Sequence, residues 1–258
     1  MSKKLFFPVF LFASMMVSIQ AYAGDTTELI DHGTLEIDPT LSLTNIHDGK
    51  PGFSSELSLG YGVTDFLTTS IAFTQSSAEA LADSDLAVTL GFLSTPLDSD
   101  FFDIDVMLDF SLEGLGAGPA SYAVTPGLEF NFDLDPDMSS WGLYLRLGLP
   151  IHSEHIIDLK SDDESLKTDL DLEFTLGTYL SFGDIHQILI EGGFTAANLA
   201  ENLGERDVLD PFLSLGYNVQ ILDTFELTSE LAFDIPKNDD DDFSATLSIG
   251  GIFSIQTQ

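Results

Sequence analysis

The chain has 258 residues, 44% of them hydrophobic, with no cysteine, and its 43 acidic residues against 8 basic ones give a formal net charge of −35. This balance excludes nucleic acid as a main partner, because too few basic residues remain to neutralise phosphates. A disulfide framework is excluded as well. The mean hydropathy is nevertheless positive, so the apolar residues must be arranged in a way that tolerates many neighbouring acids.

The first residues of the chain have the pattern of a secretory signal. Lys3 and Lys4 precede the apolar stretch 5–13, and Ala21-Tyr22-Ala23 supplies the small residues that signal peptidase requires. We therefore expect residues 1–23 to be cleaved and residues 24–258 to form one domain beyond the inner membrane. An uncleaved anchor is the alternative, which the short apolar run disfavours.

Apolar and polar residues alternate along most of the remaining chain. In residues 102–110, for example, Phe102, Ile104 and Val106 share one face of an extended strand, and the intervening aspartates share the other. About twelve segments of this kind follow one another, each long enough to cross a bilayer as a tilted strand. We expect strands at 34–44, 53–63, 66–75, 85–95, 101–112, 121–133, 140–150, 168–182, 185–195, 208–219, 224–235 and 243–255.

The connections between these segments indicate how the strands are arranged. Those after even-numbered strands are short, as in Thr64-Asp65 and Leu222-Asp223, whereas those after odd-numbered strands are mostly longer, as in 151–167 and 196–207. Short periplasmic turns and long outer loops are typical of outer-membrane barrels. The sequence therefore predicts an all-β fold, a transmembrane antiparallel up-and-down β-barrel of about 12 strands in the outer membrane of a Gram-negative bacterium.

Aromatic residues support a barrel over a soluble β-sandwich. They gather near the ends of the predicted strands and leave aliphatic residues in the middle, as interfacial girdles do. One girdle would contain Phe92 on the periplasmic side, and the other would contain Phe110 on the opposite side. In a sandwich the aromatics would instead meet across a central core.

If the apolar face meets lipid, the polar face lines the barrel interior, and most of its charged residues are acids. Carboxylates on a channel wall concentrate cations and exclude anions. We therefore predict a passive channel for small cationic or neutral solutes, although the same acids would also suit a merely solvated wall. The residues predicted to line the path are Glu56, Asp103, Asp105, Asp109, Glu129, Asp171, Glu173, Glu230 and the basic Arg146.

Two expectations concern how these inward side chains pack. Arg146, surrounded by acids, is expected to pair with Glu129 on the preceding strand or with Asp171 or Glu173 on the following one. Inward glycines are expected to leave room for large inward side chains, with Tyr144, Tyr179 and Phe212 as the candidates.

Motifs for catalysis or metal binding are weak. His152-Ser153-Glu154-His155 contains the residue types of a hydrolytic triad, but adjacent residues in a loop do not align such groups. Asp239-Asp240-Asp241-Asp242 lacks the glycine-punctuated spacing of a calcium loop. We expect no enzymatic activity, cofactor or metal, and a monomer whose partners are outer-membrane lipid and small solutes. The alternative function is a non-conducting structural or surface-binding barrel whose acidic loops bind cations.

One hairpin resembles a known family. Residues 58–67, Ser-Leu-Gly-Tyr-Gly-Val-Thr-Asp-Phe-Leu, form a strand, a tight turn and a returning strand, similar to an early hairpin of the MetA-pathway phenol-degradation (transporter-like) family of outer-membrane barrels. The resemblance implies a small barrel that takes up hydrophobic or aromatic compounds. The chain departs from common barrels at its end, where Gln256-Thr257-Gln258 stands in place of a terminal aromatic residue.

Overall fold

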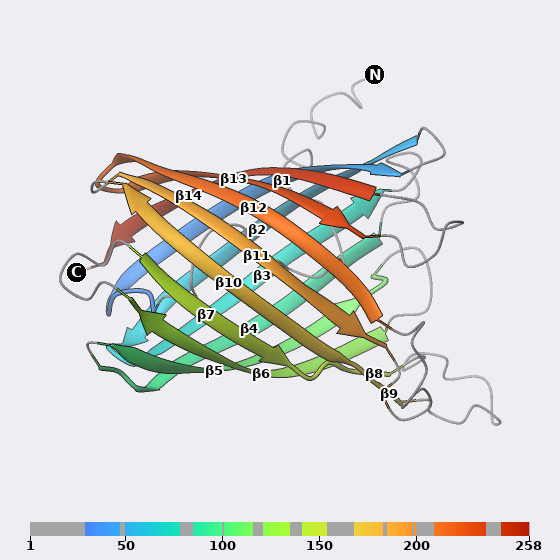
Figure 1. Ribbon diagram of the computed structural model, residues 1–258, viewed down its shortest axis with the longest axis horizontal. Helices are drawn as coiled ribbons and strands as arrows, with labels where there is room; N and C mark the ends of the chain where they lie inside the picture. Colours follow the sequence, from blue (N-terminus) through green and yellow to red (C-terminus); the bar gives the residue numbers. More distant parts are fainter. Residues whose placement is uncertain are drawn as a thin grey trace, which may run out of the picture.

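A computed structural model shows the protein as a single closed β-barrel (Figure 1). The strands are tilted relative to the barrel axis, and each lies antiparallel to its neighbours. The barrel closes because the first strand pairs with the last, Thr34 opposite Gln256, and because β5 also pairs with β6. The structure describes residues 29–46, 50–77, 85–99, 101–115, 121–134, 141–153, 168–182, 185–197, 199, 209–235 and 244–257.

Fourteen strand segments make up the wall. Each pairs with its neighbour in the chain, except where β7 and β8 both pair with β6 and where β9 and β10 run alongside them. The segments are β1 (Thr34–Ile46), β2 (Lys50–Thr64), β3 (Leu67–Ser77), β4 (Asp85–Leu97), β5 (Phe102–Glu113), β6 (Ser121–Asp133), β7 (Trp141–Gly148), β8 (Ile151–Ser153), β9 (Thr168–Leu170), β10 (Leu172–Phe182), β11 (His186–Ala196), β12 (Leu209–Leu222), β13 (Phe225–Asp234) and β14 (Ser244–Gln256).

The segments β7 and β8 form one barrel strand, and so do β9 and β10, which gives the twelve strands expected from the sequence. Their separation comes from two prolines. Leu149 donates to the Pro126 carbonyl and Asp171 donates to the Pro150 carbonyl, but neither proline has an N–H to return the bond. The register continues unchanged across the gap, since Gly127 pairs with Gly148 and Tyr122 with Ser153.

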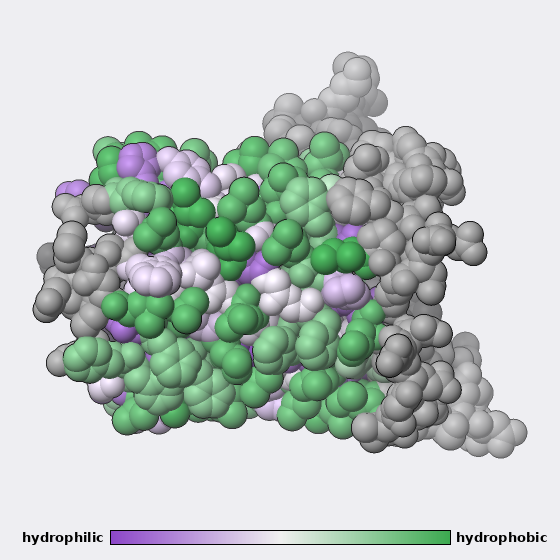
Figure 2. Space-filling view, in the orientation of Figure 1, coloured by the Kyte–Doolittle hydropathy of each residue, from purple (hydrophilic) through white to green (hydrophobic). Residues whose placement is uncertain are grey.

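The outside of the barrel is apolar and the inside is polar. Along β12, Leu213 and Leu215 are exposed, whereas Ser214 between them is buried. Figure 2 shows the outer side, where mostly apolar side chains cover the surface between the two ends. The period-two pattern therefore gives a lipid-facing surface and an inner wall, here defined as the strand side chains that point into the barrel.

The structure bears on the predicted aromatic girdles at a few residues. Trp141 lies at the turn end and its indole nitrogen donates to Thr178, while Phe174 and Phe194 stack together near the other end. Phe92 and Phe110, however, lie edge to face with their ring centroids 6.3 Å apart. Their assignment to opposite girdles is wrong, because the β4–β5 register brings them together: Leu90 lies opposite Phe110.

The two ends of the barrel differ as the sequence predicts. At one end β2 and β3 are joined by residues 65–66 and β12 and β13 by residues 223–224; at the other, the connections include 154–167 and 197–208. The start of β1 and the end of β14 lie together at the short-turn end. Among the described residues, no helix is long and apolar enough to span a membrane.

Candidate functional site

The inner wall carries all nine residues that the sequence places along the path. The residues that alternate with them along the same strands, such as Val106, Phe110 and Leu128, are exposed on the outside. The nine do not form one cluster. Five of them lie on the adjacent strands β5, β6 and β7: Asp103, Asp105, Asp109, Glu129 and Arg146. The other four lie elsewhere: Glu173 on β10, Asp171 directly before the start of β10, Glu56 on β2 and Glu230 on β13.

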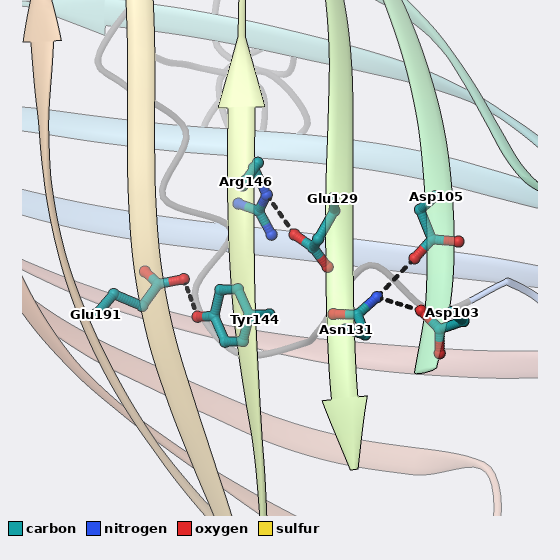
Figure 3. Close-up of polar contacts among 7 residues, drawn as sticks. All are labelled: Asp103, Asp105, Glu129, Asn131, Tyr144, Arg146 and Glu191. Carbon is teal, nitrogen blue, oxygen red and sulfur yellow. Dashed lines mark hydrogen bonds and ion pairs between the residues drawn. The ribbon is translucent and has the colours of Figure 1, made fainter. Parts of the chain in front are cut away.

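Arg146 and Glu129 form an ion pair on the inner wall (Figure 3). They lie directly opposite each other on β7 and β6, and the arginine Nε donates to Glu129 Oε2 over 2.6 Å. The Glu129 side chain is completely buried and the Arg146 side chain is 15% exposed. Of the partners expected for Arg146, Glu129 is therefore the one that it contacts, and a buried carboxylate at this place requires such a partner.

Asn131 connects two aspartates next to this pair. Its amide nitrogen donates to Asp103 over 2.7 Å and to Asp105 over 2.8 Å (Figure 3). Thr95, on the far side of β5, donates its hydroxyl to the same Asp105. Two like charges on one strand face repel each other, and an amide with two donors offsets this repulsion by bonding to both.

Two tyrosines cross a neighbouring strand to reach an acid on the next one. Tyr144 on β7 donates its hydroxyl to Glu191 on β11 (Figure 3), and the strand between them, β10, presents Gly177 opposite both. A Cβ at Gly177 would overlap the Tyr144 ring. The ring can cross β10 only because this position has no side chain.

The second tyrosine repeats the arrangement in the opposite direction. Tyr179 on β10 crosses β7 at Gly142 and donates to Asp133 on β6. A Cβ at Gly142 would overlap the Tyr179 ring, just as Phe212 on β12 lies against Gly193 of β11. The expected packing of Tyr144, Tyr179 and Phe212 against inner-wall glycines is therefore confirmed. These large side chains lie along the wall, which leaves more of the interior open than if they pointed to its centre.

Several acids lie along the wall in the same way. A Cβ at Gly91 would come within 2.9 Å of an Asp109 carboxylate oxygen, and a Cβ at Gly148 would come within 2.9 Å of a Glu173 oxygen. Asp171 pairs with His152 Nε2 at 3.3 Å.

The remaining acids lie farther around the barrel. Ser214 on β12 donates its hydroxyl to Glu191 on β11 over 3.0 Å. Glu230, on the next strand β13, is buried. On β3, Thr74 donates its hydroxyl to Glu56 on the neighbouring strand β2 over 3.4 Å. The inner wall thus carries carboxylates on most of its strands.

Sequence reasoning missed several members of the inner wall. Glu36 and Asp38 on β1 extend the acidic surface, where Ser254 donates to Glu36 and Thr40 to Asp38. Their even spacing within β1 was a readable signal, since it matches the polar face of that strand. Asn131 carried no charge to mark it, and its role depends on a register that a single strand does not reveal.

Only part of the weak motifs lies in the described chain. His152 faces Asp171, and the Ser153 hydroxyl is buried on β8; Glu154 and His155 lie outside the described residues. Asp239 to Asp242 also lie outside them. Within the described ranges, no group of three or more histidines and acids is placed to hold a metal ion.

Comparison with solved structures finds the same barrel. The KdgM porin superimposes with a TM-score of 0.58 at 9% identity, over 85% of this chain and 99% of that one. An outer-membrane channel of the COG4313 group from Pseudomonas putida F1 gives 0.57 at 15% identity, over 92% and 100%. The β-domain of the Bordetella autotransporter BrkA gives 0.53 at 11% identity, over 86% and 99%. No family model matches the chain, and no curated protein matches it either.

The fold therefore defines a class: a closed antiparallel barrel of 12 strands, like those of outer-membrane proteins. At these levels of identity the likeness shows the fold alone. The similar structures include porins, a channel and an autotransporter domain, so the function must be argued from the inner wall of this chain.

Proposed function

We propose that the protein is a passive channel in the outer membrane of a Gram-negative bacterium, for small cationic or neutral solutes. The observation that carries this proposal is the charge of the inner wall. Among its described strand residues the only arginine, Arg146, is held by Glu129, while acids occupy β1, β2, β5, β10, β11 and β13.

Charge on a confining wall selects what can enter it. The low-dielectric barrel focuses the field of its carboxylates into the interior, so cations are concentrated there and anions are repelled. Arg146 offers no counter-attraction for an anion, because its charge is already met by a buried carboxylate and it is close to Glu191. Phosphates and sugar acids should therefore be excluded.

The size and chemistry of the solute follow from the wall as well. Twelve strands enclose more space than an eight-stranded barrel that side chains fill, and less than a 16-stranded porin. The inner wall carries acids, hydroxyls and the partly exposed Tyr179 ring, which suit a small polar or aromatic solute without negative charge. Uptake of aromatic or hydrophobic compounds, implied by the hairpin at residues 58–67, is the narrower form of this proposal.

Reversal potentials in planar bilayers test the proposal. The chain without residues 1–23, inserted under a potassium chloride gradient, should give single-channel steps and a reversal potential on the cation side. The preference should weaken below pH ~4, where carboxylates ordinarily protonate. Asp103→Asn, Asp105→Asn and Asp109→Asn combined should move the reversal potential toward zero, while Asp65→Asn in the exposed β2–β3 turn serves as the control.

Two outcomes would overturn the channel. Anion selectivity of the unmodified protein would refute the acidic path. Absence of conductance steps from a correctly folded barrel would favour the non-conducting alternative, a structural or surface-binding barrel with cation-binding acidic loops.

A further inference from the structure

The five residues before β1, Leu29 to Gly33, lie against the inner wall at the short-turn end. The Ile30 amide donates to the hydroxyl of Thr68, an inner-wall residue of β3, over 2.9 Å. His32 forms a parallel bridge with Gly62 of β2. Gly62 and Gly60 belong to the inner wall, because Tyr61 and Val63 beside them are exposed on the outside. The segment therefore covers the interior face of β2 and β3.

A tight turn directs this segment inward. The Thr34 amide donates to the Asp31 carbonyl over 2.9 Å, and Gly33 has a φ of 77°. A positive φ at the third residue is the signature of a type II turn, and glycine adopts it without strain. Preceding the turn, the chain runs parallel to β2, from Ile30 at the level of Gly60 to His32 at the level of Gly62. Ile30 thus lies deeper in the barrel than His32.

Two glycines make room for the segment. A Cβ at Gly62 would overlap the backbone carbonyls of Ile30 and Asp31, and a Cβ at Gly60 would overlap the end of the Ile30 side chain. The segment is also held from both sides at the rim. Gly33 donates to the Gly62 carbonyl over 2.9 Å, and Thr257 donates to the Gly33 carbonyl over 2.7 Å. A segment that is hydrogen-bonded at both edges and packed directly against two glycines has a defined position.

We propose that Leu29–Gly33 form a fixed inner constriction at the short-turn mouth of the barrel and that its acid, Asp31, adds to the cation preference of the path. The segment narrows the interior by the thickness of one extended chain, and Ile30 gives it an apolar surface. Asp31 interacts electrostatically with Glu36 of the inner wall, so the two carboxylates act on the same part of the interior. The selectivity inferred for this mouth rests on the proposed channel function, whereas the position of the segment against β2 and β3 does not.

Conductance of point variants tests the constriction. Gly62→Ala should displace the segment, because the backbone of residues 30–31 cannot yield in place, and should raise the single-channel conductance. Gly192→Ala is the matched control, since a Cβ there meets nothing closer than 3.7 Å. Asp31→Asn should reduce the cation preference more than Asp223→Asn, an exposed residue of the β12–β13 turn at the same end. Unchanged conductance in Gly62→Ala and unchanged selectivity in Asp31→Asn would overturn the constriction.

A cross-link tests the seat of the segment independently of conduction. The chain contains no cysteine, so Ile30→Cys with Gly60→Cys introduces only two thiols. Oxidation should join them in the folded barrel, and the gel mobility of the oxidised chain should change on reduction. Ile30→Cys with Ser229→Cys, on the lipid-facing side of β13, should not cross-link. Failure of the first pair would overturn the inferred position, whereas efficient cross-linking without any conductance would leave the position standing and refute the channel.

Discussion

At the scale of single residues, the inner wall is governed by how each buried charge is matched. Glu129 is completely buried and pairs with the Arg146 guanidinium. The other acids nearby are held by neutral donors: Asn131 for Asp103 and Asp105, and Tyr144 for Glu191. Neutral donors stabilise a carboxylate without removing its charge, so the wall stays negative while its acids are fixed in place.

Replacing Arg146 should therefore destabilise the barrel strongly. Arg146→Gln leaves Glu129 buried without its counter-charge, which typically costs about 3–5 kcal/mol. The temperature at which the folded band is lost on unboiled gels should fall well below that of Lys237→Gln, which removes a cation from the β13–β14 connection.

The double variant Glu129→Gln with Arg146→Gln separates pairing from bulk. It should recover much of the lost stability, because it removes the buried charge together with its partner. Salt should change the loss little, since buried charges are poorly screened. Equal losses in Arg146→Gln and Lys237→Gln would show that the ion pair does not support the fold.

At the scale of strands, glycine and tyrosine fix how neighbours meet. The Tyr144 ring crosses β10 at Gly177, and the Tyr179 ring crosses β7 at Gly142, so each tyrosine joins three strands. Such a contact exists in one register only, because a slip of one residue would bring a lipid-facing side chain to the glycine position.

Gly177→Ala should remove this junction. The added methyl group overlaps the Tyr144 ring, so the ring must leave and its hydrogen bond to Glu191 is lost. We expect a loss of about 1–3 kcal/mol in the free energy of unfolding, measured by urea titration of the barrel in detergent or lipid. Gly192→Ala, on the outside of β11, should lose much less. If both variants lost the same stability, the crossing of β10 by Tyr144 would not stabilise the barrel.

The sequence allows the strands to be predicted, but not all of their contacts. The period-two pattern indicates the strands, their faces and their turns, because a strand in lipid must be apolar on one side throughout. Arg146 could be placed inward, but choosing Glu129 over Glu173 needed the register between strands. Phe92 and Phe110 were separated wrongly for the same reason. The inner segment before β1 went unrecognised because it has no alternation, although Asp31-His32-Gly33-Thr34 carries a type II turn signal.

At the scale of the whole molecule, the net charge of −35 must be tolerated during insertion. In the folded barrel Asp105, Glu129, Glu191 and Glu230 are buried on the inner wall, and the outer band is mostly apolar. Before folding, however, the same acids are exposed on an extended chain that approaches the membrane surface. An anionic surface should repel that chain, and the repulsion acts over the screening length of the solution.

Insertion should therefore depend on lipid charge and salt together. The chain without residues 1–23, diluted from urea into vesicles, should fold in higher yield with zwitterionic than with anionic lipid at low ionic strength, measured as the heat-modifiable band on gels. Raising the salt to ~1 M shortens the screening length to about 3 Å and should bring the two yields together. The folded barrel, once formed, should keep its thermal stability in both lipids, because its described strand acids no longer face the bilayer. Lower stability in anionic lipid after folding would mean that part of the charge remains close to the membrane surface.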